Sequence, residues 1–237
     1  MNDSIKEIST DELLKNLDNP SLKIIDVRSA DAYNGWKLKN EGRGGHIKNA
    51  RSLPLKWTKY IDWIEVVRLK QILPEHEIVV YGYDTSEAYS VAERFLKSGY
   101  HNVGVYKHFT DEWVVDPALP MQQLKRYRHL VSAEWVNMLI SGGNPVEYDN
   151  NRYVLVHAHY RNRDAYLSGH IPGAIDMDTM AVEAPDTWNR RSPEELKETM
   201  EKHGITSETT VIVYGKFMHP DNNDPFPGSA AGDIGAI

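Results

Sequence analysis

The chain reads Val79-Val80-Tyr81-Gly82-Tyr83-Asp84-Thr85-Ser86 in the middle of its first half, and this stretch decides the fold. The apolar run up to Tyr81 predicts a buried strand that stops at Gly82, and a helix is expected to begin near Glu87. In an α/β protein, such a strand-to-helix corner is where a nucleophile or a phosphate-binding loop lies. This corner carries neither, and most of what the sequence says about function depends on that absence.

Strands and helices alternate on both sides of this stretch. The sequence predicts strands at 22–27, 51–55, 78–81 and 102–106, and helices at 9–17, 57–72 and 87–98. Gly99, just past the last of these helices, is typical of a helix end. Alternation of this kind predicts the α/β class, with a central parallel sheet covered by helices on both faces in three layers.

The same pattern returns in the second half of the chain. Asp31-Ala32-Tyr33 recurs as Asp164-Ala165-Tyr166, and Val79-Val80-Tyr81-Gly82 recurs as Ile212-Val213-Tyr214-Gly215, in both cases 133 positions later. Gly45-His46-Ile47 recurs as Gly169-His170-Ile171 only 124 positions later, so the first copy holds nine extra residues before its Gly-His. Three landmarks in one order predict two copies of one α/β domain, residues 1–125 and 126–237.

The second copy is expected to be truncated. After Gly215 it runs into a loop rich in Pro, Asn and Asp at 220–228, and the chain ends where the next helix should begin. A parallel sheet without its closing helix and strand would expose apolar surface. We therefore expect a further segment of a longer protein, or a partner, to complete the fold.

Composition excludes several classes of function. A net charge of −7 argues against nucleic acid or an anionic membrane as the partner of the whole molecule. No apolar run is long enough to span a bilayer, and the polar, charged N-terminus shows no signal peptide, which predicts the cytoplasm, or the periplasm if a signal peptide was removed. The chain has no cysteine, so it has no disulfide, no thiolate metal ligand and no cysteine nucleophile of its own.

Several landmarks resemble the rhodanese (sulfurtransferase) superfamily. They are Ile25-Asp26-Val27-Arg28 and Gly45-His46-Ile47 in the first copy, and Gly169-His170-Ile171-Pro172-Gly173-Ala174 in the second. The resemblance covers nearly the whole chain. The long insertion before Gly45 is similar to the first domain of bacterial three-rhodanese-domain sulfurtransferases, a resemblance which implies that the active cysteine lies in the last domain.

The resemblance also implies a chemistry and the position of its missing residue. Rhodaneses transfer sulfane sulfur from thiosulfate or 3-mercaptopyruvate through a cysteine persulfide, activated by converging backbone N–H groups and a helix N-terminus. In the family that cysteine directly follows the Val-Tyr of the fourth strand, which places it at Gly82 and Gly215. Neither residue can be a nucleophile, and the related cysteine phosphatases are excluded for the same reason.

The loops around these glycines are expected to be vestigial. They comprise Tyr83, Asp84, Thr85 and Ser86 in the first copy and Lys216 in the second. Asp84 and Glu87 would repel an anionic substrate at the mouth of the helix.

Other polar residues have a plain structural interpretation. Asp26 and Arg28 could contact a ligand, but pairing with neighbours is favoured because buried polar groups are normally satisfied. His46 and His170 lie in equivalent turns, where bridging of backbone groups is favoured over ligand binding. His157 and His159 share one face of a strand, an arrangement that is compatible with binding a metal. They stand where the resemblance implies the family's Asp-Val-Arg, so an inactive domain whose sequence has drifted explains them better. We expect no metal and no cofactor.

A basic stretch in the insertion has two interpretations. It comprises Lys37, Lys39, Arg43, Lys48 and Arg51, opposed only by Glu41. A solvated loop is the default, and a docking face for an acidic partner or for another domain of the same protein is the functional version.

Two hypotheses remain open. In the first, the chain is the non-catalytic part of a sulfurtransferase whose cysteine lies downstream, so its partner is a further rhodanese domain of the same protein. In the second, it is a cysteine-less module that recognises a protein or a small anion. A Val-Tyr-Cys domain encoded after Ile237 would separate the two.

Overall fold

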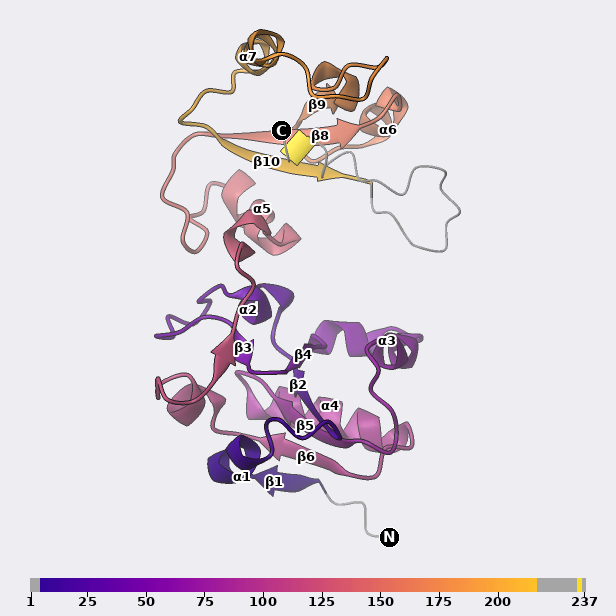
Figure 1. Cartoon of the computed structure of the whole chain (residues 1–237), viewed down its shortest axis with the longest axis vertical. Coiled ribbons are helices and arrows are strands. Elements are labelled where there is room, and N and C mark those ends of the chain that lie inside the picture. Colours follow the sequence, from indigo (N-terminus) through magenta and orange to yellow (C-terminus); the bar gives the residue numbers. More distant parts are fainter. Residues whose placement is uncertain (1–4, 217–233, 236–237) are drawn as a thin grey trace. The chain divides into compact units, whose positions relative to one another are not determined.

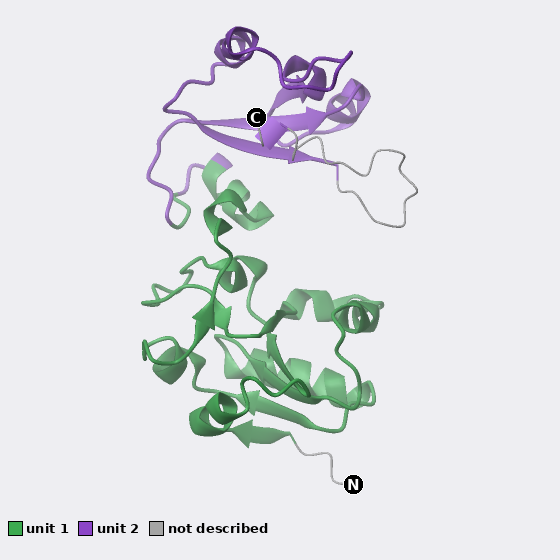
Figure 2. Cartoon of the chain, in the orientation of Figure 1, with its two compact units in different colours: residues 1–139, 144–146 green, residues 140–143, 147–237 purple. Residues whose placement is uncertain are grey.

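The computed structural model describes residues 5–216 and 234–235, and these fall into two compact units (Figure 2). Unit 1 comprises residues 1–139 and 144–146, and unit 2 comprises residues 140–143 and 147–237. The boundary between residues 125 and 126 stays a prediction, because spatial compactness does not mark where the sequence repeat begins.

Unit 1 is built around a five-stranded parallel sheet in the order β1-β6-β5-β2-β4 (Figure 1). A second, two-stranded antiparallel sheet joins β3 to β7. The elements are β1 (Lys6–Ile8), α1 (Thr10–Lys15), β2 (Leu22–Asp26), α2 (Ala30–Asn34), β3 (His46–Ile47), β4 (Arg51–Ser52), η1 (Leu55–Lys59), α3 (Trp63–Leu69), β5 (Glu77–Tyr81), α4 (Thr85–Lys97), β6 (Val103–Tyr106), η2 (Phe109–Trp113), β7 (Met121–Gln122), η3 (Tyr127–His129) and α5 (Ala133–Ile140).

The two faces of this sheet carry two separate apolar cores. Ile24, Val79 and Tyr81 pack on one face with Leu13 of α1, while Ile25 and its neighbours pack on the other. Alternate residues of a strand point to opposite faces, so consecutive residues of β2 and β5 contribute side chains to both cores. The second face is covered by the apolar sides of α3 and α4, from Val67, Val91, Ala92 and Phe95. This three-layer arrangement confirms the predicted α/β class.

Two elements differ from the sequence-based prediction. The strand expected at 51–55 is only Arg51–Ser52, and the helix expected at 57–72 is a 3₁₀ turn followed, after a break, by α3. The break occurs where Tyr60 takes an extended conformation and Ile61 is fully exposed, at 101%. The prediction of one helix over 57–72 was therefore wrong, because Tyr60 and Ile61, two apolar residues of the period, do not face the core.

Unit 2 repeats the centre of unit 1. Its elements are β8 (Tyr153–His159), α6 (Arg163–Ser168), β9 (Ile175–Asp178), η4 (Thr179–Ala181), α7 (Pro193–Lys202) and β10 (Thr210–Gly215). The parallel order β10-β8-β9 matches β5-β2-β4 of unit 1 in register. Asp26 pairs with Tyr81 in unit 1, and His157 pairs with Tyr214 in unit 2. Two copies of these three central strands are thus confirmed.

The expected loop at 220–228 lies outside the described residues, whereas Ile234 is buried in the core cluster of unit 2. Among the helices that the structure describes, none has the length and apolar character needed to cross a membrane.

Candidate functional site

The corner after β5 has no room for a side chain. Gly82 is buried, and a Cβ built on it would lie 2.8 Å from Cγ2 of Val27, a contact that real Cβ atoms do not make. Val27 is itself 2% exposed and branched at Cβ, so it cannot swing aside without disturbing the core. The position that the resemblance assigns to the family's cysteine is therefore packed as a glycine.

The start of α4 is occupied by a carboxylate of the protein itself. Asp84 is the N-cap residue, and its Oδ1 accepts a hydrogen bond of 2.7 Å from the backbone N–H of Ser86. Hydrogen bonds from the Ser86 hydroxyl, and then from the backbone N–H groups of Ser86 and Glu87, lower the pKa of Asp84 below its usual value. The N–H groups that would hold an anionic substrate are thus already engaged with an internal anion.

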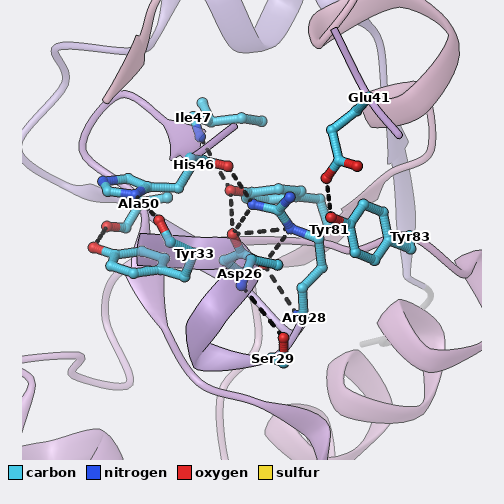
Figure 3. Close-up of polar contacts among 12 residues, drawn as sticks. Asp26, Arg28, Ser29, Tyr33, Glu41, His46, Ile47, Ala50, Tyr81 and Tyr83 are labelled. Carbon is cyan, nitrogen blue, oxygen red and sulfur yellow. Dashed lines mark hydrogen bonds and ion pairs between the residues drawn. The ribbon is translucent and has the colours of Figure 1, made fainter. Parts of the chain in front are cut away.

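Beneath the corner lies a buried ion pair at the end of β2 (Figure 3). Arg28 Nη2 is 2.6 Å from Asp26 Oδ2, and both side chains are 1% exposed or less. The Tyr81 hydroxyl donates to Asp26 Oδ2 at 2.7 Å, and Arg28 Nη2 also donates to the carbonyl of Gly45 at 2.6 Å. Burial, and then the negative charge of Asp26, raise the pKa of Tyr81 well above its usual value.

Three aromatic rings enclose the guanidinium of this pair. Its central carbon lies 4.2 Å from the ring centre of Phe109, 4.9 Å from that of Tyr83 and 5.6 Å from that of Tyr81. Asp26 and Arg28 therefore satisfy each other and fix the loops around them, and the structure brings neither to an open surface.

His46 and His170 make the same contacts in the two units. His46 stacks on Tyr33 with ring centres 3.8 Å apart and joins the Tyr33 carbonyl through Nδ1 at 2.7 Å. His170 stacks on Tyr166 at 3.9 Å and joins the Tyr166 carbonyl at 2.9 Å. The tyrosine hydroxyls in turn donate to the carbonyls of Ala50 and Ala174. Both histidines therefore bridge backbone segments of their own turn.

The difference between the two histidines is burial, which gives a pH prediction. His46 is 6% exposed, and desolvation by burial lowers its pKa below that of the unfolded chain. Because the folded state disfavours the protonated imidazole, unit 1 should lose stability as pH falls below about 6.5. Urea denaturation between pH 7.5 and 5 should show this loss, and His46→Gln should flatten it. His170→Gln, at the exposed equivalent position, is the matched control; an equal flattening by that variant would contradict the assignment.

The insertion of unit 1 folds back onto the corner. The Tyr83 hydroxyl donates to the Glu41 carboxylate (Figure 3), and burial, followed by this hydrogen bond, raises the pKa of Tyr83. The two ends of the insertion meet closely, because a Cβ on Gly44 would lie 1.9 Å from the carbonyl oxygen of Gly35. Between the insertion, the corner and the end of η2 lies an open cleft of about 820 Å³, lined by Lys39, Asn40, Glu41, Gly42, Tyr83, Asp84, Thr85, Thr110, Val114 and Val115.

Arg43 does not contribute to a basic docking face. Its guanidinium donates to the backbone carbonyls of Trp113, Val114, Asp116 and Leu119, so it ties the insertion to the segment after η2. Lys48 pairs with Asp18 at 2.8 Å. Two of the five basic residues are therefore engaged within unit 1, Arg43 as a structural anchor and Lys48 in an ion pair.

The insertion also holds the segment that leads toward α5. Trp36 packs on Tyr127 and Trp135, with ring centres 5.4 and 6.3 Å away, and its indole N–H donates to the carbonyl of Leu130 at 3.1 Å. Lys56 adds a 3.1 Å ion pair to Glu134 of α5. This role of the insertion could not be predicted from the sequence, since Trp36 and Leu130 lie 94 residues apart in the chain.

In unit 2 the buried pair is rebuilt from other residues. His157 and His159 take the places of Asp26 and Arg28, and His159 Nε2 lies 2.5 Å from Asp176 Oδ1. Nδ1 of His157 is buried without a hydrogen-bond partner, between the rings of Tyr166 and Tyr214. Gly215 ends β10, and Lys216 after it is exposed.

The side chains that could together hold a metal lie elsewhere. Within residues 5–216 and 234–235, the one group of three with ligand atoms close enough together is His108, Asp111 and Glu112, at the start of η2. Its members are about half exposed and pair with one another, His108 Nδ1 lying 3.0 Å from Asp111 and 3.4 Å from Glu112. The sequence reasoning did not single out this spacing. Pairing of one half-exposed imidazole with two exposed carboxylates is a sufficient explanation of this group.

The fold, the repeated Gly-His-Ile turns and the corner after β5 define a rhodanese-like protein. The sequence profile of the Rhodanese-like domain matches residues 9–116 and 134–223, and the chain belongs to this family. It is 31% identical over 219 residues to the thiosulfate sulfurtransferase YnjE of Escherichia coli, covering 90% of this chain and 48% of YnjE.

Solved structures add more similar proteins. An anaerobic ergothioneine biosynthesis enzyme from Chlorobium limicola, in complex with its natural substrate trimethyl histidine, is 60% identical with a TM-score of 0.87, over 98% of this chain and 55% of that one. A variant of EanB with a cysteine persulfide, in a tetrahedral intermediate state with ergothioneine, is 61% identical with a TM-score of 0.86, over the same shares. The chain thus spans about half the length of these relatives.

Proposed function

We propose that this chain is the non-catalytic tandem-rhodanese part of a sulfurtransferase whose persulfide cysteine lies outside residues 1–237. The observation that carries the proposal is the corner after β5, where Gly82 packs against Val27 and Asp84 fills the N-terminus of α4. The second aligned position is Gly215, and the sequence contains no cysteine. The persulfide that the family's chemistry requires therefore has to come from another part of the protein.

The acceptor that we propose is a trimethylated histidine, with ergothioneine as the product. Identity of 60% over 98% of this chain to an enzyme that acts on trimethyl histidine supports this acceptor more strongly than 31% identity to YnjE supports thiosulfate chemistry alone. Thiosulfate or 3-mercaptopyruvate remains the proposed class of sulfur donor.

The test compares two proteins that differ in length. Residues 1–237, and the protein translated from the gene read past Ile237, are incubated with thiosulfate and trimethyl histidine, and ergothioneine is quantified by mass spectrometry. The longer protein should form ergothioneine and residues 1–237 should form none. Sulfur transfer by residues 1–237 alone, or a gene that encodes no further cysteine-containing domain, would remove the proposal.

A second candidate is a cysteine-less binding module. The cleft of about 820 Å³ beside the corner favours it, since cavities of this size at the carboxyl ends of parallel strands commonly hold small ligands. If the gene encodes no catalytic domain after Ile237, binding at this cleft is the function that remains.

A further inference from the structure

The cleft of unit 1 has the features of a ligand site that the sulfur-transfer chemistry does not use. It lies where β5 ends and α4 begins, at the carboxyl edge of the parallel sheet. Its volume of about 820 Å³ falls within the range of small-molecule pockets. Two of its lining groups, Tyr83 and Asp84, have shifted pKa values, as groups in binding sites often do.

The lining disfavours an anion. Asp84 holds the N–H groups of the first turn of α4, so no helix N-terminus is open to a phosphate or a sulfate. Arg28, which follows β2, is engaged in its pair with Asp26 and is 3% exposed. An anionic ligand in the cleft would face the carboxylates of Asp84 and Glu41 with Lys39 as the single lining cation.

The remaining groups suit a small positively charged molecule. Glu41 is held in place by the Tyr83 hydroxyl and by the backbone N–H of Lys39, so its carboxylate is presented without further loss of side-chain freedom. Thr85 and Thr110 add hydroxyls, and Val114 and Val115 add an apolar wall. Two carboxylates beside an apolar wall suit an alkylated ammonium group, because the carboxylates attract its charge and the wall contacts its methyl groups.

We propose that the cleft formed by the insertion and the vestigial corner of unit 1 binds a small organic cation of the quaternary ammonium type. The insertion supplies one carboxylate through Glu41, and the corner supplies the other through Asp84, so both carboxylates of the site belong to unit 1. Binding at this cleft does not depend on where the persulfide cysteine lies.

The test uses residues 1–237 and choline as the probe, with binding followed by chemical-shift changes or titration calorimetry. Glu41→Gln and Asp84→Asn should each weaken choline binding roughly three- to tenfold, because each removes one charge from a partly screened cation–carboxylate contact. Asn is also a good N-cap residue, so Asp84→Asn leaves α4 intact. Lys39→Gln should tighten binding about twofold, since it removes a like charge.

Glu198→Gln, an exposed position on α7 of unit 2, is the matched control and should leave choline binding unchanged. Thiosulfate is titrated in parallel and should not displace choline. Absence of choline binding, binding that survives Glu41→Gln and Asp84→Asn together, or stronger binding of thiosulfate at the same residues would each overturn the proposal. Because none of these readouts depends on sulfur transfer, they are separate from the test of the proposed function.

Discussion

Arg28→Ala should destabilise unit 1 by about 3–5 kcal/mol, because it leaves the carboxylate of Asp26 buried without its counter-charge. Asp26 is completely buried, and among the described residues its carboxylate would keep the Tyr81 hydroxyl and, after substitution, the backbone N–H of position 28 as donors. The carbonyl of Gly45 would lose its donor as well, and the rings of Tyr83 and Phe109 would lose the cation between them. Urea denaturation followed by tryptophan fluorescence measures the change.

A double variant distinguishes the net contribution of the ion pair to stability from the destabilisation that follows when one partner is left unpaired. Asp26→Leu with Arg28→Met replaces both charges by apolar groups of similar size, so it should recover much of the stability that either single variant loses. The double-mutant cycle should then give a coupling of about 2 kcal/mol or more between the two positions. If the effects of the two single changes simply add, Asp26 and Arg28 are not a coupled unit and do not hold the loops around them together.

Much of the fold could be predicted because its sequence landmarks occur twice in the chain. The Val-Tyr-Gly corner, the Asp-Ala-Tyr helix and the Gly-His-Ile turn recur in order, and in both units they place a tyrosine hydroxyl beside the turn, where Ile47 and Ile171 donate their backbone N–H to Tyr81 and Tyr214. Asp26 and Arg28 could also be expected to pair locally, since two residues apart at a strand end they share one face.

The cleft could not be predicted, because its walls come from three separate segments: the insertion, the corner and the end of η2. Nor could the role of Arg43, which looks like a surface charge in the sequence and becomes an anchor only when the end of η2 and the segment after it present four carbonyls to it. The break at Tyr60 and Ile61 could not be predicted for a related reason. The apolar period shows which residues are apolar, but it does not show which of them the tertiary structure buries.

Gly82→Cys places a thiol at the position that the resemblance assigns to the family's nucleophile, and it should still give no thiosulfate:cyanide sulfurtransferase activity. Two physical reasons support this. The new Cβ would meet Cγ2 of Val27 at 2.8 Å, which should cost about 1–3 kcal/mol of stability through overpacking. The carboxylate of Asp84 occupies the N-terminus of α4, so the thiolate would face a negative charge where active cysteines face N–H groups.

Paired variants distinguish these two reasons. Val27→Ala added to Gly82→Cys should recover the stability, by removing the methyl group that clashes, and should leave the activity at the blank. Asp84→Asn added to that pair should lower the thiol pKa, measured from the pH dependence of alkylation, toward or below the usual value of about 8.5, since it removes the opposing charge. Cyanide-dependent thiocyanate from Gly82→Cys alone would show that the filled helix N-terminus does not prevent persulfide chemistry. If Gly82→Cys is inactive and the double variant with Val27→Ala is active, packing and not the carboxylate of Asp84 prevents activity at this corner.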